Sequence, residues 1–261
     1  MYQPFPRKEP ALTRFLPLFL LLLLLFSSCG TASADIRSVP ILMYHDISAD
    51  SAPDNAFTVP LSLFDEHLSA LADAGYTSVT FADLISFVYF DGDLPERPVV
   101  ITADDGYTNV LTLAAPAAAR HGMTISCAVI GSLSGSGSHF SLDGDIPSNV
   151  EIISHTYALH DRTLTFAPEL GSYEQLLTDD YRRMCGCYAG RFPQIPTVLV
   201  YPHGVYSTES EQILHHLGVL VTVTCDAGVA VIEKGNPESL YALPRLSVWK
   251  NTNLKELMAN D

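Results

Sequence analysis

The stretch Pro98-Val-Val-Ile-Thr-Ala-Asp104-Asp105-Gly106-Tyr107 decides how the chain folds and where its chemistry lies. It places two adjacent carboxylates at the carboxyl end of a short apolar run, which is typical of a buried strand. Neighbouring residues of a regular strand point to opposite faces, so Asp104 and Asp105 can serve one site only where the strand ends. Gly106 permits a backbone turn at this point. An isolated Asp-Asp-Gly more often caps a following helix.

On both sides of this stretch, strand-like apolar runs alternate with helix-like runs, which predicts βα units around a parallel sheet. Strands are expected at 39–44, 76–80, 99–102, 124–130, 150–154, 197–201, 219–224 and 243–248. Helices are expected at 62–74, 81–90, 108–121, 172–188, 209–217 and 253–258. The segment 131–149 is rich in glycine and serine, and we expect it to form a surface loop over the site.

Four separate segments place polar side chains directly after predicted strands. His45 follows the first strand, the aspartate pair follows the third, His155 follows the run 150–154, and His203 follows the run that ends at Tyr201. In a parallel βα barrel these strand ends share one rim, which is where such folds place their chemistry. We therefore expect the four segments to converge.

His160 follows His155 by five residues. One carboxylate and two imidazoles form a ligand set for a catalytic divalent metal with open coordination positions. A lone histidine is usually a satisfied polar group, whereas two near one strand end with acidic partners favour a metal site. The remaining carboxylate is then free to act as a base. Surface positions are expected for the other histidines, His67, His121, His139, His215 and His216.

Residues 1–34 are expected to be a targeting segment with a short linker. Basic residues precede the apolar run 15–26, which is short for a bilayer span and fits a signal-peptide core. Ala32-Ser33-Ala34 is a cleavage signal, while the stretch around Cys29 resembles a bacterial lipoprotein box. We expect an exported protein, extracellular or in the cell envelope, that meets a membrane only through this segment or a lipid on Cys29.

The charge of the chain beyond residue 34 is strongly negative, since 11 of the 14 Lys and Arg and 28 of the 29 Asp and Glu lie there, a net charge of 11 − 28 = −17. Such a surface repels phosphate backbones, so nucleic acid is not an expected partner. We expect a monomer with one large core over residues 35–261. An even number of cysteines permits disulfides without specifying any: Cys127, Cys185, Cys187 and Cys225.

These motifs resemble those of polysaccharide deacetylases, the NodB-homology domain of carbohydrate esterase family 4. The similar stretches are Ile101-Thr-Ala-Asp104-Asp105-Gly106, Ser154-His155-Thr-Tyr-Ala-Leu-His160 and Tyr201-Pro-His203-Gly204, within a match over 39–258. The five-residue histidine spacing is similar to that of the exported subgroup acting on poly-N-acetylglucosamine. The resemblance implies an α/β fold, a distorted (β/α)7–8 TIM-like barrel.

The resemblance also implies a role for each matching residue. Asp104 matches the general base, and the metal ligands are Asp105, His155 and His160. The backbone N–H of His203 matches a group that holds the oxyanion, and His45 matches the general acid of the poly-N-acetylglucosamine subgroup. The implied cofactor is a divalent metal, Zn²⁺ foremost, with Co²⁺ or Ni²⁺ as alternatives. The implied reaction removes N-acetyl groups from a GlcNAc-containing polysaccharide, peptidoglycan or poly-N-acetylglucosamine.

Two alternatives stay open at this stage. An O-acetyl esterase, for example of the xylan type, would share the attack step but would not need His45 as an acid. A catalytically silent glycan-binding lipoprotein of the same fold is suggested by two departures from the family pattern. Ala103 stands where the family has Phe, and no arginine lies near the third motif to orient the base. His203 also replaces a common aromatic residue.

Overall fold

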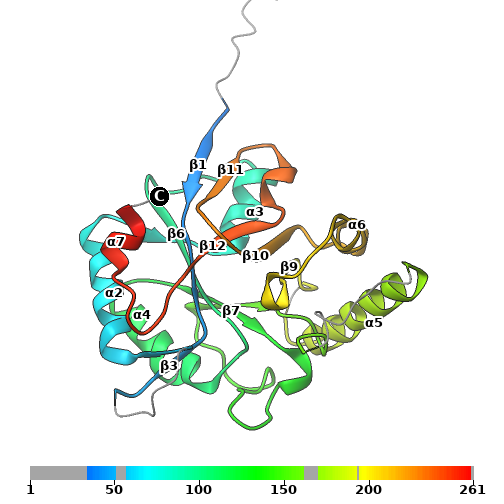
Figure 1. Cartoon of the computed structure of the whole chain (residues 1–261), viewed down its shortest axis with the longest axis horizontal. Helices are drawn as coiled ribbons and strands as arrows, with labels where there is room; N and C mark the ends of the chain where they lie inside the picture. Colours follow the sequence, from blue (N-terminus) through cyan, green and yellow to red (C-terminus); the bar gives the residue numbers. More distant parts are fainter. Residues whose placement is uncertain (1–33, 51–56, 162–169, 193, 260–261) are drawn as a thin grey trace, which may run out of the picture. The chain divides into compact units, whose positions relative to one another are not determined.

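Seven parallel strands of the described residues close into a barrel in this computed structural model (Figure 1). The structure describes residues 34–259 except 51–56, 162–169 and 193. Around the barrel the strands run in the order β2 (Ile41–Tyr44), β6 (Pro98–Ala103), β7 (Ile125–Val129), β8 (Val150–Ser154), β9 (Val198–Val200), β10 (Val221–Ala227) and β12 (Leu243–Ser247). The pairings β12 with β2 and β2 with β6 complete the closure. The predicted (β/α)7–8 barrel is therefore confirmed, in its seven-stranded form.

The alternation of β6 separates the inside of the barrel from its outer layer. All six residues of this strand are buried. Val99 and Ile101 pack with side chains of the surrounding helices, whereas Val100 packs with inward residues of the other strands. Thr102 and Asp104 continue the register of Val100, so they face the interior.

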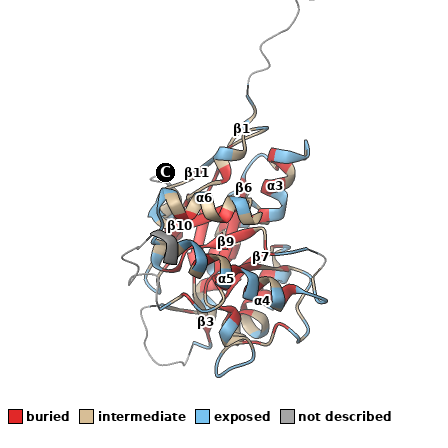
Figure 2. Ribbon diagram, turned by 90° about the vertical axis from the view of Figure 1, so that its right-hand side faces the viewer, coloured by how far each residue is buried: buried red, intermediate tan, exposed pale blue. Residues whose placement is uncertain are grey.

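Helices pack against the barrel, and the helix at 81–89 has its buried side chains in the cluster of inward-facing strand residues. The helices are α2 (Leu61–Asp73), α3 (Phe81–Tyr89), α4 (Ala115–Arg120), α5 (Leu170–Tyr188), α6 (Thr208–Leu217) and α7 (Leu254–Ala259). Figure 1 shows α2, α4 and α7 grouped on one side, with α5 and α6 on the other. Figure 2 shows the buried strands inside and exposed residues along the helices. Among the described residues, no helix is long and apolar enough to cross a membrane.

Three expectations about local structure need correction. The predicted strand 39–44 is divided at Pro40, which has no N–H for a ladder bond. Its first part, β1 (Ile36–Val39), pairs instead with β11 (Ala230–Glu233) in a small antiparallel sheet. β5 (Thr77–Ser78) pairs with the start of β6 without entering the closed ring, and a second small sheet joins β3 (Asp46–Ser48) to β4 (Thr58–Pro60). The predicted helix 108–121 begins as a π-helical turn, Val110–Ala114.

The compact unit of the structure begins at Asp35. The expected signal segment and the expected lipid on Cys29 lie outside the described residues. Among the residues that are described, all four cysteines are free thiols: Cys127, Cys185, Cys187 and Cys225.

Candidate active site

A cavity of about 520 Å³ opens at the carboxyl ends of the barrel strands. All six residues singled out from the sequence line it: His45, Asp104, Asp105, His155, His160 and His203. Phe57, Tyr107 and Trp249 add aromatic surface to its wall. The predicted convergence of four distant segments is therefore what the fold produces.

The turn after β6 brings both aspartates to this cavity. Asp105 has a φ of 74° and Gly106 a φ of 84°, both in the left-handed region. A non-glycine residue rarely adopts this conformation, and Asp is among those that tolerate it. The strand alternation is broken at Asp105, so its carboxylate turns to the same side as that of Asp104. The sequence pointed to Gly106 alone for this turn, and the structure adds Asp105.

Asp105, His155 and His160 form a cluster that could hold a metal ion. One ligand atom from each of them lies within 4.8 Å of the other two. Asp105 Oδ1 is 3.7 Å from His155 Nε2 and 3.4 Å from His160 Nε2. This oxygen is buried and accepts no hydrogen bond from the residues described. A buried carboxylate oxygen without a donor is costly, so the donor set fits a cation between the three side chains.

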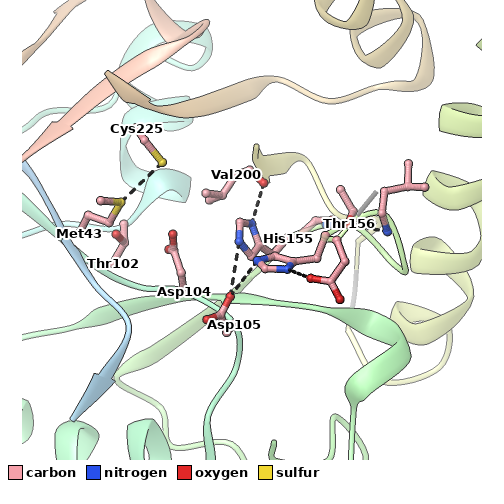
Figure 3. Close-up of polar contacts among 12 residues, drawn as sticks. Met43, Thr102, Asp104, Asp105, His155, Thr156, Val200 and Cys225 are labelled. Atoms are coloured by element: carbon pink, nitrogen blue, oxygen red, sulfur yellow. Dashed lines mark hydrogen bonds and ion pairs between the residues drawn. The ribbon is translucent and has the colours of Figure 1, made fainter. Parts of the chain in front are cut away.

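Hydrogen bonds to the remaining ring nitrogens orient both imidazoles. His155 Nδ1 donates to the carbonyl of Val200 over 2.8 Å, as Figure 3 shows, which leaves the lone pair on Nε2 facing Asp105. His160 Nδ1 lies 2.9 Å from Asp161 Oδ1. Metal-binding histidines commonly hold a carbonyl or carboxylate on their second nitrogen in this way.

The electrostatics of the cluster differ between the two histidines. Burial lowers the pKa of His155, which favours the neutral imidazole that a metal requires. The carboxylate of Asp105 raises the pKa of His160 to about 9, with burial opposing and Asp161 adding to the effect. Burial also opposes ionisation of Asp105, but the two imidazoles hold its pKa below the ordinary value.

Both oxygens of Asp104 bond to an arginine to which the sequence analysis assigned no role. Arg245 on β12 is fully buried, and its Nη1 and Nη2 each donate to one carboxylate oxygen of Asp104 at 2.8 Å. The same guanidinium donates to the carbonyl of Thr224 and the hydroxyl of Thr102. No arginine lies near the third motif, as the sequence shows, but β12 supplies one from the end of the chain. Burial alone would raise the pKa of Asp104, but Arg245 brings it to about 2.

An aromatic wall surrounds His45 at the mouth of the cavity. The ring of Trp249 lies nearly parallel to that of His45, with 6.4 Å between centroids, and Phe57 approaches both rings edge-on. Phe57 is 52 % exposed, so this wall is open to an incoming ligand. Planar apolar faces of this kind are suited to the apolar faces of a sugar ring or its acetyl group.

His203 occupies the short helical turn Pro202–Gly204 that follows β9. Its φ is 56°, and its ring centroid lies 4.7 Å from that of His160. Gly204 allows this turn to lie close to β10, because a Cβ at that position would be 2.7 Å from the backbone nitrogen of Cys225. The side chain of His203 is exposed at the rim, as the sequence suggested.

The surface position expected for His67 was wrong. Its side chain is buried, with Nδ1 3.0 Å from the hydroxyl of Tyr44 and Nε2 3.2 Å from the carbonyl of Thr252. Tyr44 precedes His45, and Thr252 closes the turn that begins at Trp249. His67 therefore ties together two segments that form the aromatic wall.

Comparisons with known proteins agree with this architecture. Residues 91–222, half of the chain, match the profile of the polysaccharide deacetylase family. The protein YxkH of Bacillus subtilis (strain 168), whose name provisionally places it in that family, is 29 % identical over 210 residues, which cover 80 % of this chain and 71 % of YxkH.

Solved structures share the fold. The Streptococcus pyogenes deacetylase PplD in complex with acetate superposes with a TM-score of 0.71 and 22 % identity, covering 86 % of this chain and 98 % of PplD. IcaB from Ammonifex degensii superposes with a TM-score of 0.70 and 22 % sequence identity, and the match covers 85 % of this chain and 96 % of IcaB. The de-N-acetylase from Aggregatibacter actinomycetemcomitans superposes with a TM-score of 0.70 and 19 % sequence identity, and the match covers 86 % of this chain and 99 % of the de-N-acetylase.

Proposed function

The chain belongs to the polysaccharide deacetylase family, so it is an enzyme that acts on an acetylated glycan. From this premise we propose that it is a metal-dependent hydrolase that removes N-acetyl groups from a GlcNAc-containing polysaccharide, either peptidoglycan or poly-N-acetylglucosamine. The observation that carries the proposal is the position of the buried Oδ1 of Asp105 between two imidazole Nε2 atoms, with no hydrogen bond to it from the described residues.

The proposed metal ligands are Asp105, His155 and His160. One carboxylate and two imidazoles suit Zn²⁺, and Co²⁺ or Ni²⁺ would also fit the donor set. A divalent cation held there supplies Lewis acidity toward the acetyl carbonyl and the attacking water. Groups of the chain itself must then transfer the protons of the attacking water and the leaving amine, and stabilise the negative charge that develops on the acetyl oxygen.

Asp104 is the proposed general base. Both of its oxygens bond to Arg245, yet each keeps a second lone pair that can accept a proton from water. A pKa of about 2 keeps this carboxylate ionised, but it also limits the driving force for proton transfer. The base therefore depends on a water acidified beside it, which agrees with its position next to Asp105.

His203 and His45 are proposed to act on the substrate. The backbone N–H of His203 would donate to the oxyanion that forms at the acetyl carbon. His45 would protonate the departing amine, a step that an amide requires more than an ester does. Its place in the cavity wall, next to Trp249, suits contact with a sugar.

The buried pair of Asp104 and Arg245 removes one reason for considering a silent glycan-binding protein.

Export remains part of the proposal and rests on the sequence alone. The apolar run 15–26 and the cleavage signal or lipoprotein box after it would deliver the enzyme to the cell envelope or beyond. Acetylated cell-wall or biofilm polymers would be accessible there. The free thiols of the described residues neither require nor oppose this location.

Removing metal is expected to abolish acetate release. Purified protein would be treated with a chelator, dialysed, and assayed on N-acetylglucosamine oligomers and peptidoglycan before and after addition of Zn²⁺ or Co²⁺. Activity should fall to background and return with the metal, in step with the metal bound per chain. Full activity in a protein shown to be free of metal would contradict the proposal.

Replacing His45 by alanine is expected to separate amide from ester hydrolysis. Loss of a general acid should slow acetate release from N-acetylglucosamine oligomers by about 100- to 10,000-fold, whereas an activated acetyl ester should lose far less. His216→Ala, at an exposed position of α6, is a suitable histidine control. Equal retention of both activities would favour the O-acetyl esterase alternative.

A further inference from the structure

Asp180 on α5 is a buried carboxylate that the proposed mechanism does not use. It is 6 % exposed. Its Oδ2 accepts the backbone N–H of Tyr157 over 2.7 Å, and its Oδ1 accepts that of Ala158 over 2.8 Å. Tyr157 and Ala158 lie between His155 and His160 in the sequence. Hydrogen bonds from a backbone N–H to an ionised carboxylate are stronger than those between neutral groups.

The other backbone N–H groups of this loop bond locally. Thr156 donates to the hydroxyl of Ser154, and Leu159 donates to the hydroxyl of Thr156, both over 3.2 Å. Among the described residues, Asp180 is thus the side chain from a distant element that holds the N–H groups between the two histidines. The peptide N–H groups of Gly131 and Ser132 bond the loop carbonyls on the other side.

The loop needs such support because its backbone is strained. Thr156, seen in Figure 3 beside His155, has a φ of 68°, which is rare for a β-branched residue. Strained conformations persist only where the surrounding structure holds them. His155 is independently fixed by β8 and by its bond to Val200. The position of His160, after the loop, is the one most dependent on Asp180.

We propose that Asp180 is a positioning residue for the metal site, holding the 156–159 loop so that His160 Nε2 faces Asp105. This inference rests on the proposed function, since it assumes that Asp105, His155 and His160 bind the metal. A ligand held off its place by a relaxed loop would bind the cation more weakly. The same donor atoms would be present, so the difference would lie in preorganisation.

The test compares Asp180→Asn with Asp179→Asn. Asparagine at 180 offers one acceptor and directs its own N–H toward a backbone N–H, so one bond is lost and a repulsion is introduced. Asp179 is the adjacent residue on the same helix, is exposed and loses the same charge. Zn²⁺ and Co²⁺ dissociation constants would be measured by competition with a chelator. Asp180→Asn is expected to weaken them about 10- to 100-fold, and Asp179→Asn to leave them unchanged.

The outcomes separate this inference from the function on which it rests. A wild-type chain that binds no metal would overturn the proposed function itself. A wild-type chain that binds metal, with Asp180→Asn folded and equal in affinity, would overturn the role of Asp180 alone. A second measurement needs no variant: in metal-free wild-type protein, the amides of Tyr157 and Ala158 should be protected from hydrogen exchange. Rapid exchange of both amides would overturn the proposal.

Discussion

Replacing Asp104 by asparagine is expected to slow acetate release by about 100- to 10,000-fold, the range for removal of a general base. Asparagine is nearly isosteric, but its amide cannot accept a proton from water, and it removes the charge and one of the two acceptors that Arg245 uses, so some stability should also be lost. The variant should retain its metal, because Asp104 is not a proposed ligand. Acetate release and bound metal would both be measured per folded chain.

The control for this variant is Asp143→Asn, which removes a carboxylate from the exposed loop after β7. Its turnover should match the wild type. Turnover of folded Asp104→Asn within a few-fold of the wild type would eliminate Asp104 as the base, whereas loss of turnover together with loss of metal would reassign it to the ligand set.

Replacing Arg245 by leucine is expected to destabilise the fold by about 3–5 kcal/mol. The variant leaves the carboxylate of Asp104 buried without its partner, and it also leaves the carbonyl of Thr224 without its donor. Removing one partner of a buried ion pair is costly because the remaining charge is neither paired nor solvated. Urea unfolding of metal-free protein, followed by circular dichroism, would give the change in the free energy of unfolding.

The matched control is Arg120→Leu. Arg120 and Asp65 are also 2.8 Å apart, but their side chains are 59 % and 42 % exposed, so the loss of stability should be far smaller than that for Arg245→Leu. The double variant Asp104→Leu with Arg245→Leu should recover much of the stability, because it removes both buried charges. A loss for Arg245→Leu no greater than that for Arg120→Leu would contradict the importance of burial.

Lowering the pH should also reveal how much the ion pair between Asp104 and Arg245 contributes to stability. The pKa of Asp104 is lowered in the folded protein to about 2, from an ordinary value of 3.8. A lowered carboxyl pKa contributes stability that is present above the unfolded value and is lost as pH falls through the folded value. The stability of the wild type should therefore fall relative to that of the double variant as the pH is lowered from about 4 to about 2.

Most of the residues that sequence reasoning found follow an apolar run, and His160 was found by its spacing from His155. His45, His155 and the aspartate pair could be grouped because parallel strands of a barrel end at a common rim. Arg245 was assigned no role because it lies inside the run 243–248 rather than after it. A charge within an apolar strand was itself a signal, since a buried guanidinium must find a carboxylate.

Asp180 carried a similar signal in a helix. Leu177, Tyr181 and Met184 mark the buried face of α5, and Asp180 falls on that face three residues after Leu177 and four before Met184. An acidic residue in an apolar stripe predicts a buried donor partner. Which donor it meets could not be predicted, because local sequence patterns do not place α5 relative to the loop 156–159.

By itself the sequence determined the alternation of strands and helices, the barrel class and the side chains available at its rim, because these follow from local periodicity and from the geometry of parallel strands. Only the tertiary structure decided which groups meet. Arg245 reaches Asp104 across 141 positions of the chain, and Asp180 reaches the loop between the histidines from another element. Such contacts depend on the closure of the whole barrel, since a hydrogen bond requires atoms within about 3 Å and local sequence patterns fix positions only within an element.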